Sequence, residues 1–178
     1  GQRLDLVVDA GGGDAVLALD ISGDIVEVCY FEREGADGDG ALPDNFALPI
    51  NPIPVNVDLA KARTVPVVIA GGAKGGLMSA KFKNEVLDLR ALLERGMAWA
   101  INGVAGPGGE LIGSFAKGET IIMEINNTTQ FDQPLHIHGH VWQVIEQGGA
   151  IQEGQPWRDT AVVPQKQVQK LAFVADNP

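Results

Sequence analysis

Short β-prone runs separated by turn residues dominate this chain and restrict the folds that it can adopt. Residues 15–21 and 25–31 each read as a strand, and the Ser-Gly-Asp turn at residues 22–24 joins them as in an antiparallel hairpin. Turn signals recur about every ten residues, which is typical of an all-β sandwich or Greek-key barrel. Further strands are predicted at residues 4–9, 65–70, 97–102, 119–126, 159–163 and 168–174, and in the segment that ends at Ile145.

One segment breaks the β pattern and predicts a single short helix. Residues 84–95 carry apolar side chains at helical spacing, with a capping residue before them and a glycine after them. The residues of this pattern are Val86, Leu89, Leu92 and Leu93 on one face, Asn84 as the cap and Gly96 as the stop.

The glycine-rich segment 71–76 could suggest a nucleotide site. Its glycine spacing does not fit the dinucleotide fingerprint, and no Gly-Lys-Ser/Thr follows as in a phosphate loop. Nucleotide binding is therefore not expected.

A domain boundary is predicted before the middle of the chain. Residues 34–40 are acidic and glycine-rich, and prolines at positions 43, 49, 52 and 54 favour an extended connector over a central strand. We expect one domain to end at residue 48, a proline-rich linker at 49–63 and a second domain at 64–178. Because strand-like runs lie at both ends, we expect the chain to be truncated at both ends.

Charge and apolar patterning exclude some partners. The net charge of −10 argues against nucleic acid, which needs a basic surface. No apolar run reaches the length of about 18 residues that a membrane-spanning helix needs. The single cysteine, Cys29, lies in a strand-like run and is expected to be a buried, inert thiol.

All three histidines of the chain lie within the segment 136–140. His136, His138 and His140 occupy alternate positions, so in a strand they would share one face unless Gly139 bends the backbone. Neutral imidazole is a good ligand for copper, zinc, nickel and iron. A single histidine is usually a structural residue, but the clustering predicts a transition-metal site whose other ligands come from elsewhere.

Several motifs, in order along the chain, resemble those of the multicopper oxidases, the family of laccases, bilirubin oxidases and bacterial copper oxidases. The resemblance covers nearly the whole chain. Gly1–Asp9 resembles a strand near the end of the middle domain, and the remaining motifs resemble parts of the final domain. These are Trp99-Ala100-Ile101-Asn102-Gly103, the run 123–140, Trp157-Arg158-Asp159-Thr160 and the run 173–178 before the closing copper motif.

The resemblance implies a cupredoxin-like Greek-key β-sandwich, with residues 1–48 as the end of a middle cupredoxin domain. It also implies copper, with His136 at the lone copper of a trinuclear cluster and His138 at one of the paired coppers. His140 would support them through a hydrogen bond. Gln133 stands where the family has the histidine of the mononuclear blue copper. Residues 157–160 are expected to anchor a strand and loop near this motif.

The resemblance implies an oxidoreductase that couples one-electron oxidation of a phenol-like or metal-ion donor to reduction of O₂ to water. It also implies a periplasmic or secreted protein. The fragment alone would be inactive, because the cluster needs histidines from a missing N-terminal cupredoxin domain of the same or a neighbouring chain.

Two alternatives remain. A redox-inert cupredoxin-fold periplasmic binding or assembly protein would have lost its mononuclear copper site, as Gln133 suggests. A cupin-type metal enzyme shares the His-x-His strand but expects a glutamate where Val141, Trp142 and Gln143 stand.

Overall fold

The computed structural model describes residues 13–21, 23–32, 47, 49, 57–107 and 109–177. The described residues fall into two compact units, one holding the first hairpin and the other holding the elements from residue 57 onward. The predicted strand 4–9, the acidic loop 34–40 and most of the proline-rich segment lie outside the described residues.

The first unit contains a two-stranded antiparallel ribbon, β1 (Ala15–Ile21) and β2 (Asp24–Phe31), which confirms the predicted hairpin. A register shift after Leu17 marks a bulge. Nearly every side chain of the ribbon is exposed. The expectation for Cys29 was wrong, because its thiol is exposed on this ribbon.

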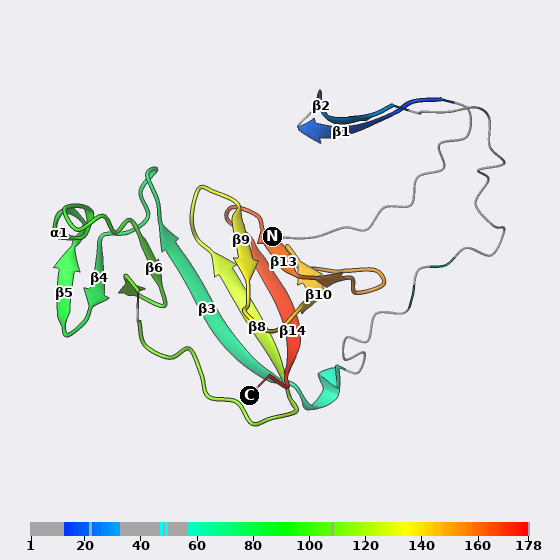
Figure 1. The fold of residues 1–178 in the computed structure, drawn as a ribbon. Helices are drawn as coiled ribbons and strands as arrows, with labels where there is room; N and C mark the ends of the chain where they lie inside the picture. The colour runs from blue at the N-terminus through cyan, green and yellow to red at the C-terminus, as the bar shows by residue number, and fades with distance from the viewer. Residues whose placement is uncertain are drawn as a thin grey trace. The chain divides into compact units, whose positions relative to one another are not determined.

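The second unit is built mainly from strands (Figure 1). Its elements, in chain order, are a 3₁₀ turn η1 (Leu59–Lys61), β3 (Arg63–Gly71), β4 (Ser79–Phe82), β5 (Glu85–Asp88), α1 (Leu89–Leu93), β6 (Trp99–Ile101), β7 (Val104–Ala105), β8 (Glu119–Asn127), β9 (Gln133–His136), β10 (Trp142–Gln147), β11 (Ala150–Ile151), β12 (Trp157–Arg158), β13 (Thr160–Val163) and β14 (Val168–Ala175).

A large mixed sheet and a small two-stranded sheet form the two layers of this unit. The large sheet runs in the order β11-β10-β14-β8-β3-β6-β7-β4-β5, with β12 beside β10, and β9 pairs with β13 in the small sheet. The β3–β8 pair is parallel, whereas β8–β14 and β10–β14 are antiparallel. This mixed, crossed connectivity agrees with the predicted all-β Greek-key class.

The main core lies between these two layers. Alternate residues of β3, β8, β10 and β14 point inward, as the side-chain period of a strand requires. Ala161 and Val163 of β13 are buried against them, and Leu135 of β9 packs on the same cluster. The core residues are Val67, Ile69, Ile121, Met123, Ile125, Trp142, Val144, Ala161, Val163, Leu171 and Phe173.

The predicted helix over 84–95 was too long. Residues 79–88 form the β4–β5 hairpin, in which Lys83 takes a positive φ of 56° at the turn. The helix covers only Leu89–Leu93, and its N-cap is Asp88, whose side chain accepts a hydrogen bond from the backbone N–H of Ala91. The expected apolar face is divided, because Leu92 is fully buried whereas Val86 is 75% exposed. None of the described helices is long and apolar enough to cross a membrane.

Candidate metal centre

Strand β9 carries Gln133 and His136 on opposite faces. In the β9–β13 ladder, Gln133 pairs with Val163 and His136 pairs with Thr160. Val163 is fully buried in the main core, so the Gln133 side of the strand faces inward. His136, three positions later, lies on the outer face, where its side chain is 36% exposed.

Gly139 bends the chain shortly after the end of β9, which is one of the two alternatives that the sequence left open. The strand ends at His136, Gly139 takes a φ of 78°, and the backbone N–H of His140 donates to the Ile137 carbonyl at 3.3 Å. We call residues 137–141 the histidine loop. His136 and His138, which precede the bend, are exposed residues, whereas His140, which follows it, is partly buried.

The rings of His136 and His138 lie side by side. Their centroids are 5.1 Å apart, with an angle of 70° between the ring planes. Nδ1 of His136 lies 3.0 Å from the Asp159 carbonyl oxygen and 3.2 Å from Asp159 Oδ1. Both are acceptors when the carboxylate is ionised, so Nδ1 carries the hydrogen of the neutral ring and Nε2 keeps its lone pair. The geometry therefore leaves Nε2 of His136 as a metal donor.

His140 takes a structural position under the histidine loop. Its Nδ1 lies 3.3 Å from the His138 carbonyl oxygen. Its ring makes an edge contact with the Phe173 ring, and the two ring centroids are 5.2 Å apart. Its Nε2 is buried without a hydrogen-bond partner among the described residues. The carboxylate of Asp176 is 4.0 Å from this nitrogen, which is too long for a hydrogen bond. His140 thus contacts the backbone of His138, and its expected role in supporting the copper ligands stays a prediction.

Gln133 belongs to a polar network at the inner end of β9. Its amide nitrogen lies 3.3 Å from the hydroxyl of Thr129, which in turn donates to the side-chain carbonyl of Asn127 at 2.7 Å. Asn127 and Thr129 are completely buried, and the Asn127 amide donates to the Val163 carbonyl at 2.9 Å. The structure does not bring Gln133 together with His136, because the two lie on opposite faces of β9.

Asp159 is a site residue that sequence reasoning assigned only to a structural corner. The segment 157–160 does lie against the histidine motif, since β12 pairs with β10 and β13 pairs with β9. The direct contact between Asp159 and His136 follows from the β9–β13 register, which the sequence alone does not give. The sequence did offer one hint, because Asp159 is an acidic residue in the motif 157–160, which was expected to lie near the histidines.

The described part of the chain does not contain a complete metal site. No three His, Cys, Asp or Glu side chains among the described residues converge in a way that could hold an ion. The donors present, two adjacent imidazoles, fit copper in type, because imidazole binds copper well. These two imidazoles are only part of a copper ligand set. The single cysteine, Cys29, lies in the other compact unit.

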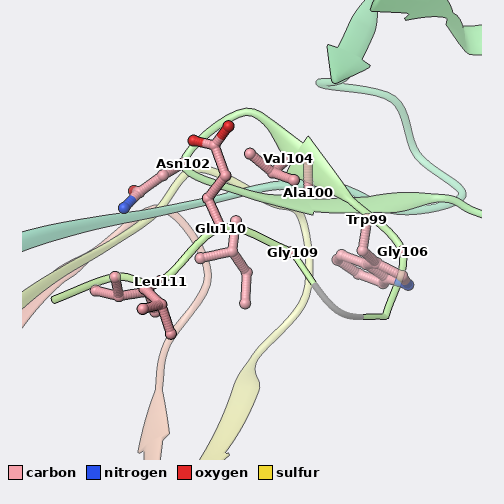
Figure 2. A pocket seen from close by; sticks show the side chains of 10 residues that line it. Trp99, Ala100, Asn102, Val104, Gly106, Gly109, Glu110 and Leu111 are labelled. Carbon is pink, nitrogen blue, oxygen red and sulfur yellow. The ribbon is translucent and has the colours of Figure 1, made fainter. Parts of the chain in front are cut away.

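A separate pocket lies at β6, β7 and the following loop and has a cavity volume of about 470 Å³. Figure 2 shows Trp99, Asn102, Glu110 and Leu111 among its lining side chains. Glu110 forms an ion pair with Lys81, and Asn102 accepts a hydrogen bond from the Val68 N–H at 2.7 Å. No histidine lines this pocket.

Comparison with known proteins identifies the family of this chain. A family model described as multicopper oxidase matches residues 82–178, which is more than half of the chain. The multicopper oxidase MmcO of Mycobacterium tuberculosis is 36% identical over 61 residues, which are 34% of this chain and 12% of that protein.

Solved structures give the same fold. Lac15 from a marine microbial metagenome has a TM-score of 0.59 at 17% identity and is matched over 98% of this chain and 34% of its own. A bacterial laccase-like multicopper oxidase, CueO from Ochrobactrum sp., has a TM-score of 0.58 at 16% identity, covering 89% of this chain and 33% of its own. The chain therefore spans about a third of these proteins and about an eighth of MmcO.

The likeness confirms the expected cupredoxin-like fold, and copper is the metal that this family uses. The chain belongs to the multicopper oxidase family.

Proposed function

We propose that this chain is part of a copper-dependent oxidase that couples one-electron oxidation of a phenol-like or metal-ion donor to reduction of O₂ to water. The observation that carries the proposal is the pair of adjacent imidazoles, 5.1 Å apart, with Nε2 of His136 left as a donor. Bound copper supplies the one-electron redox change, which no amino-acid side chain of this pair can supply.

This chain would supply two copper ligands and the residues that orient them. His136 would bind the lone copper of a trinuclear cluster and His138 one of the paired coppers, as the family motif implies. Asp159 holds the Nδ1 side of His136, and His140 braces the backbone of His138. Two imidazoles do not complete such a cluster, so the remaining ligands would come from an N-terminal cupredoxin domain of the same or a neighbouring chain. The fragment alone would then be inactive.

A redox-inert binding or assembly protein of the same fold is the second candidate, and Gln133 is the observation that favours it. An amide is a poor substitute for an equatorial imidazole at a mononuclear copper, and the Gln133 amide nitrogen already contacts Thr129. Either protein would be periplasmic or secreted, which fractionation of the tagged full-length protein would test.

Oxygen uptake by the copper-loaded full-length protein distinguishes the two candidates. We expect oxygen consumption with a phenol or a reduced metal ion as donor, and its loss in the double variant His136→Ala/His138→Ala. Glu153→Gln is a suitable control, because this carboxylate is exposed and lies between β11 and β12. If the loaded protein reduces no oxygen with either class of donor, the oxidase proposal fails and the redox-inert candidate gains support.

A further inference from the structure

Asp159 presents two oxygen atoms to the same nitrogen of His136. The backbone carbonyl lies 3.0 Å from Nδ1 and the carboxylate oxygen Oδ1 lies 3.2 Å from it. We propose that the Asp159 carboxylate is a positioning residue that fixes the orientation of His136 and strengthens its Nε2 as a copper ligand. This inference rests on the proposed function, since it concerns the same metal centre.

The β9–β13 ladder fixes the position of Asp159. Thr160, the next residue, is the first of β13 and pairs directly with His136. The following residues of β13 anchor the strand, because Ala161 and Val163 are buried in the main core. Asp159 is therefore the single bend residue between β12 and β13, and a paired strand on each side holds it beside His136.

The carboxylate itself is held in place. The hydroxyl of Thr160 donates a hydrogen bond to Oδ1 of Asp159 at 3.0 Å, and the Asp159 side chain is only 19% exposed. Because the Asp159 carboxylate is already held, it loses little conformational entropy when it accepts the hydrogen on Nδ1 of His136. Its negative charge polarises the imidazole ring and makes the opposite nitrogen, Nε2, a more basic ligand.

The backbone carbonyl alone would orient the ring but would not supply this charge. Asp159→Ala keeps the carbonyl and removes the carboxylate, and Asp159→Asn keeps a side-chain oxygen without the charge. If the carboxylate has the proposed role, copper affinity decreases in the order wild type, Asn, Ala. The loss in Asp159→Ala is expected to be about 10-fold or more, as is usual for partners of ligating histidines.

The experiment uses the full-length protein loaded with copper(II). Copper affinity is measured by competition with a chelator, and pulsed EPR measures the quadrupole coupling of the imidazole nitrogen remote from the metal. This coupling responds to hydrogen bonding at that nitrogen, so it separates the proposed role from a general loss of structure. Asp176→Asn is the matched control, because its carboxylate lies near His140 and not near His136.

The proposal predicts weaker copper binding and a changed remote-nitrogen coupling in both Asp159 variants, with neither change in Asp176→Asn. Unchanged affinity and coupling in Asp159→Ala would overturn the role of the carboxylate while leaving the oxidase proposal intact. Absence of copper from the loaded wild type would overturn both.

Discussion

Gln133 and His136, the first and last residues of β9, lie in different surroundings. Gln133 lies on the inner face of β9 beside Val163, in contact with the buried Thr129 hydroxyl. His136 lies on the outer face, next to Asp159. An imidazole placed at position 133 would therefore lie at a different face from the proposed cluster ligands.

The substitution Gln133→His tests whether position 133 adjoins a mononuclear copper. In the copper-loaded full-length protein we expect a stronger band at about 600 nm, because imidazole is a better equatorial ligand than an amide at a copper–thiolate site. Gln130→His is the control, since Gln130 is an exposed residue before the same strand. Equal spectra for the two variants would show that no mononuclear site adjoins position 133.

The ion pair between Arg63 and Glu119 makes the stability of the fold depend on pH. Nε of Arg63 donates to the Glu119 carboxylate at 2.6 Å, which holds the pKa of Glu119 below its ordinary value of 4.5. A lowered pKa in the folded state stabilises the fold above pH 4.5, and this contribution is lost as the pH falls through the lowered pKa.

We therefore expect Glu119→Gln to lower the melting temperature slightly above pH 4.5, with the difference from wild type shrinking at lower pH. Thermal unfolding followed by circular dichroism across this range measures the effect, with Glu153→Gln as the control. A difference that stays constant down to strongly acidic pH would contradict the ion-pair account.

Individual strands could be predicted well from the sequence, whereas the hairpin at residues 79–88 could not. Alternation gave β8 and β14 nearly to the residue, because one face of each is buried in the main core. Residues 84–95 also satisfied a helical spacing, but the β4–β5 turn at Lys83 and the cap at Asp88 limit the helix to five residues. Residues 85–88 form a strand because they pair with β4, and the spacing of apolar residues within one segment carries no information about such pairing.

The bend of the histidine loop gives a prediction for Gly139. A Cβ at this position would lie 1.8 Å from the Asn177 amide nitrogen, and its φ is 78°. Gly149 shares a positive φ, 85°, but a Cβ there would meet no atom within 4 Å. We expect Gly149→Ala to cost about 1–2 kcal/mol of unfolding free energy through the backbone alone.

Gly139→Ala should cost more than Gly149→Ala, because the Asn177 side chain must also move. Urea denaturation of both variants measures the difference. Equal losses would show that the Asn177 side chain moves away from the added methyl group at no cost in stability.

For the whole molecule, the clustering of histidines predicted a candidate metal centre, but the sequence could not show which of the three side chains are exposed and which is partly buried. His136 lies on the outer face of β9 and His138 is exposed before the bend at Gly139, whereas His140 after the bend lies against Phe173. The role of Asp159 needed the strand register. The domain limits at residues 48 and 63 remain predictions.

The ribbon β1–β2 bears on the domain prediction. It has exposed apolar side chains on both strands, among them Leu19, Ile25 and Phe31. A two-stranded ribbon is marginally stable by itself. That residues 1–48 are the end of a larger middle domain stays a prediction.

The copper content of the full-length protein, measured after copper loading and removal of free metal, tests whether His136 and His138 bind copper. The account predicts several coppers per chain in the wild type and fewer in the double variant His136→Ala/His138→Ala. A wild type without copper, or a double variant that retains the wild-type number, would contradict the assignment of His136 and His138 as copper ligands.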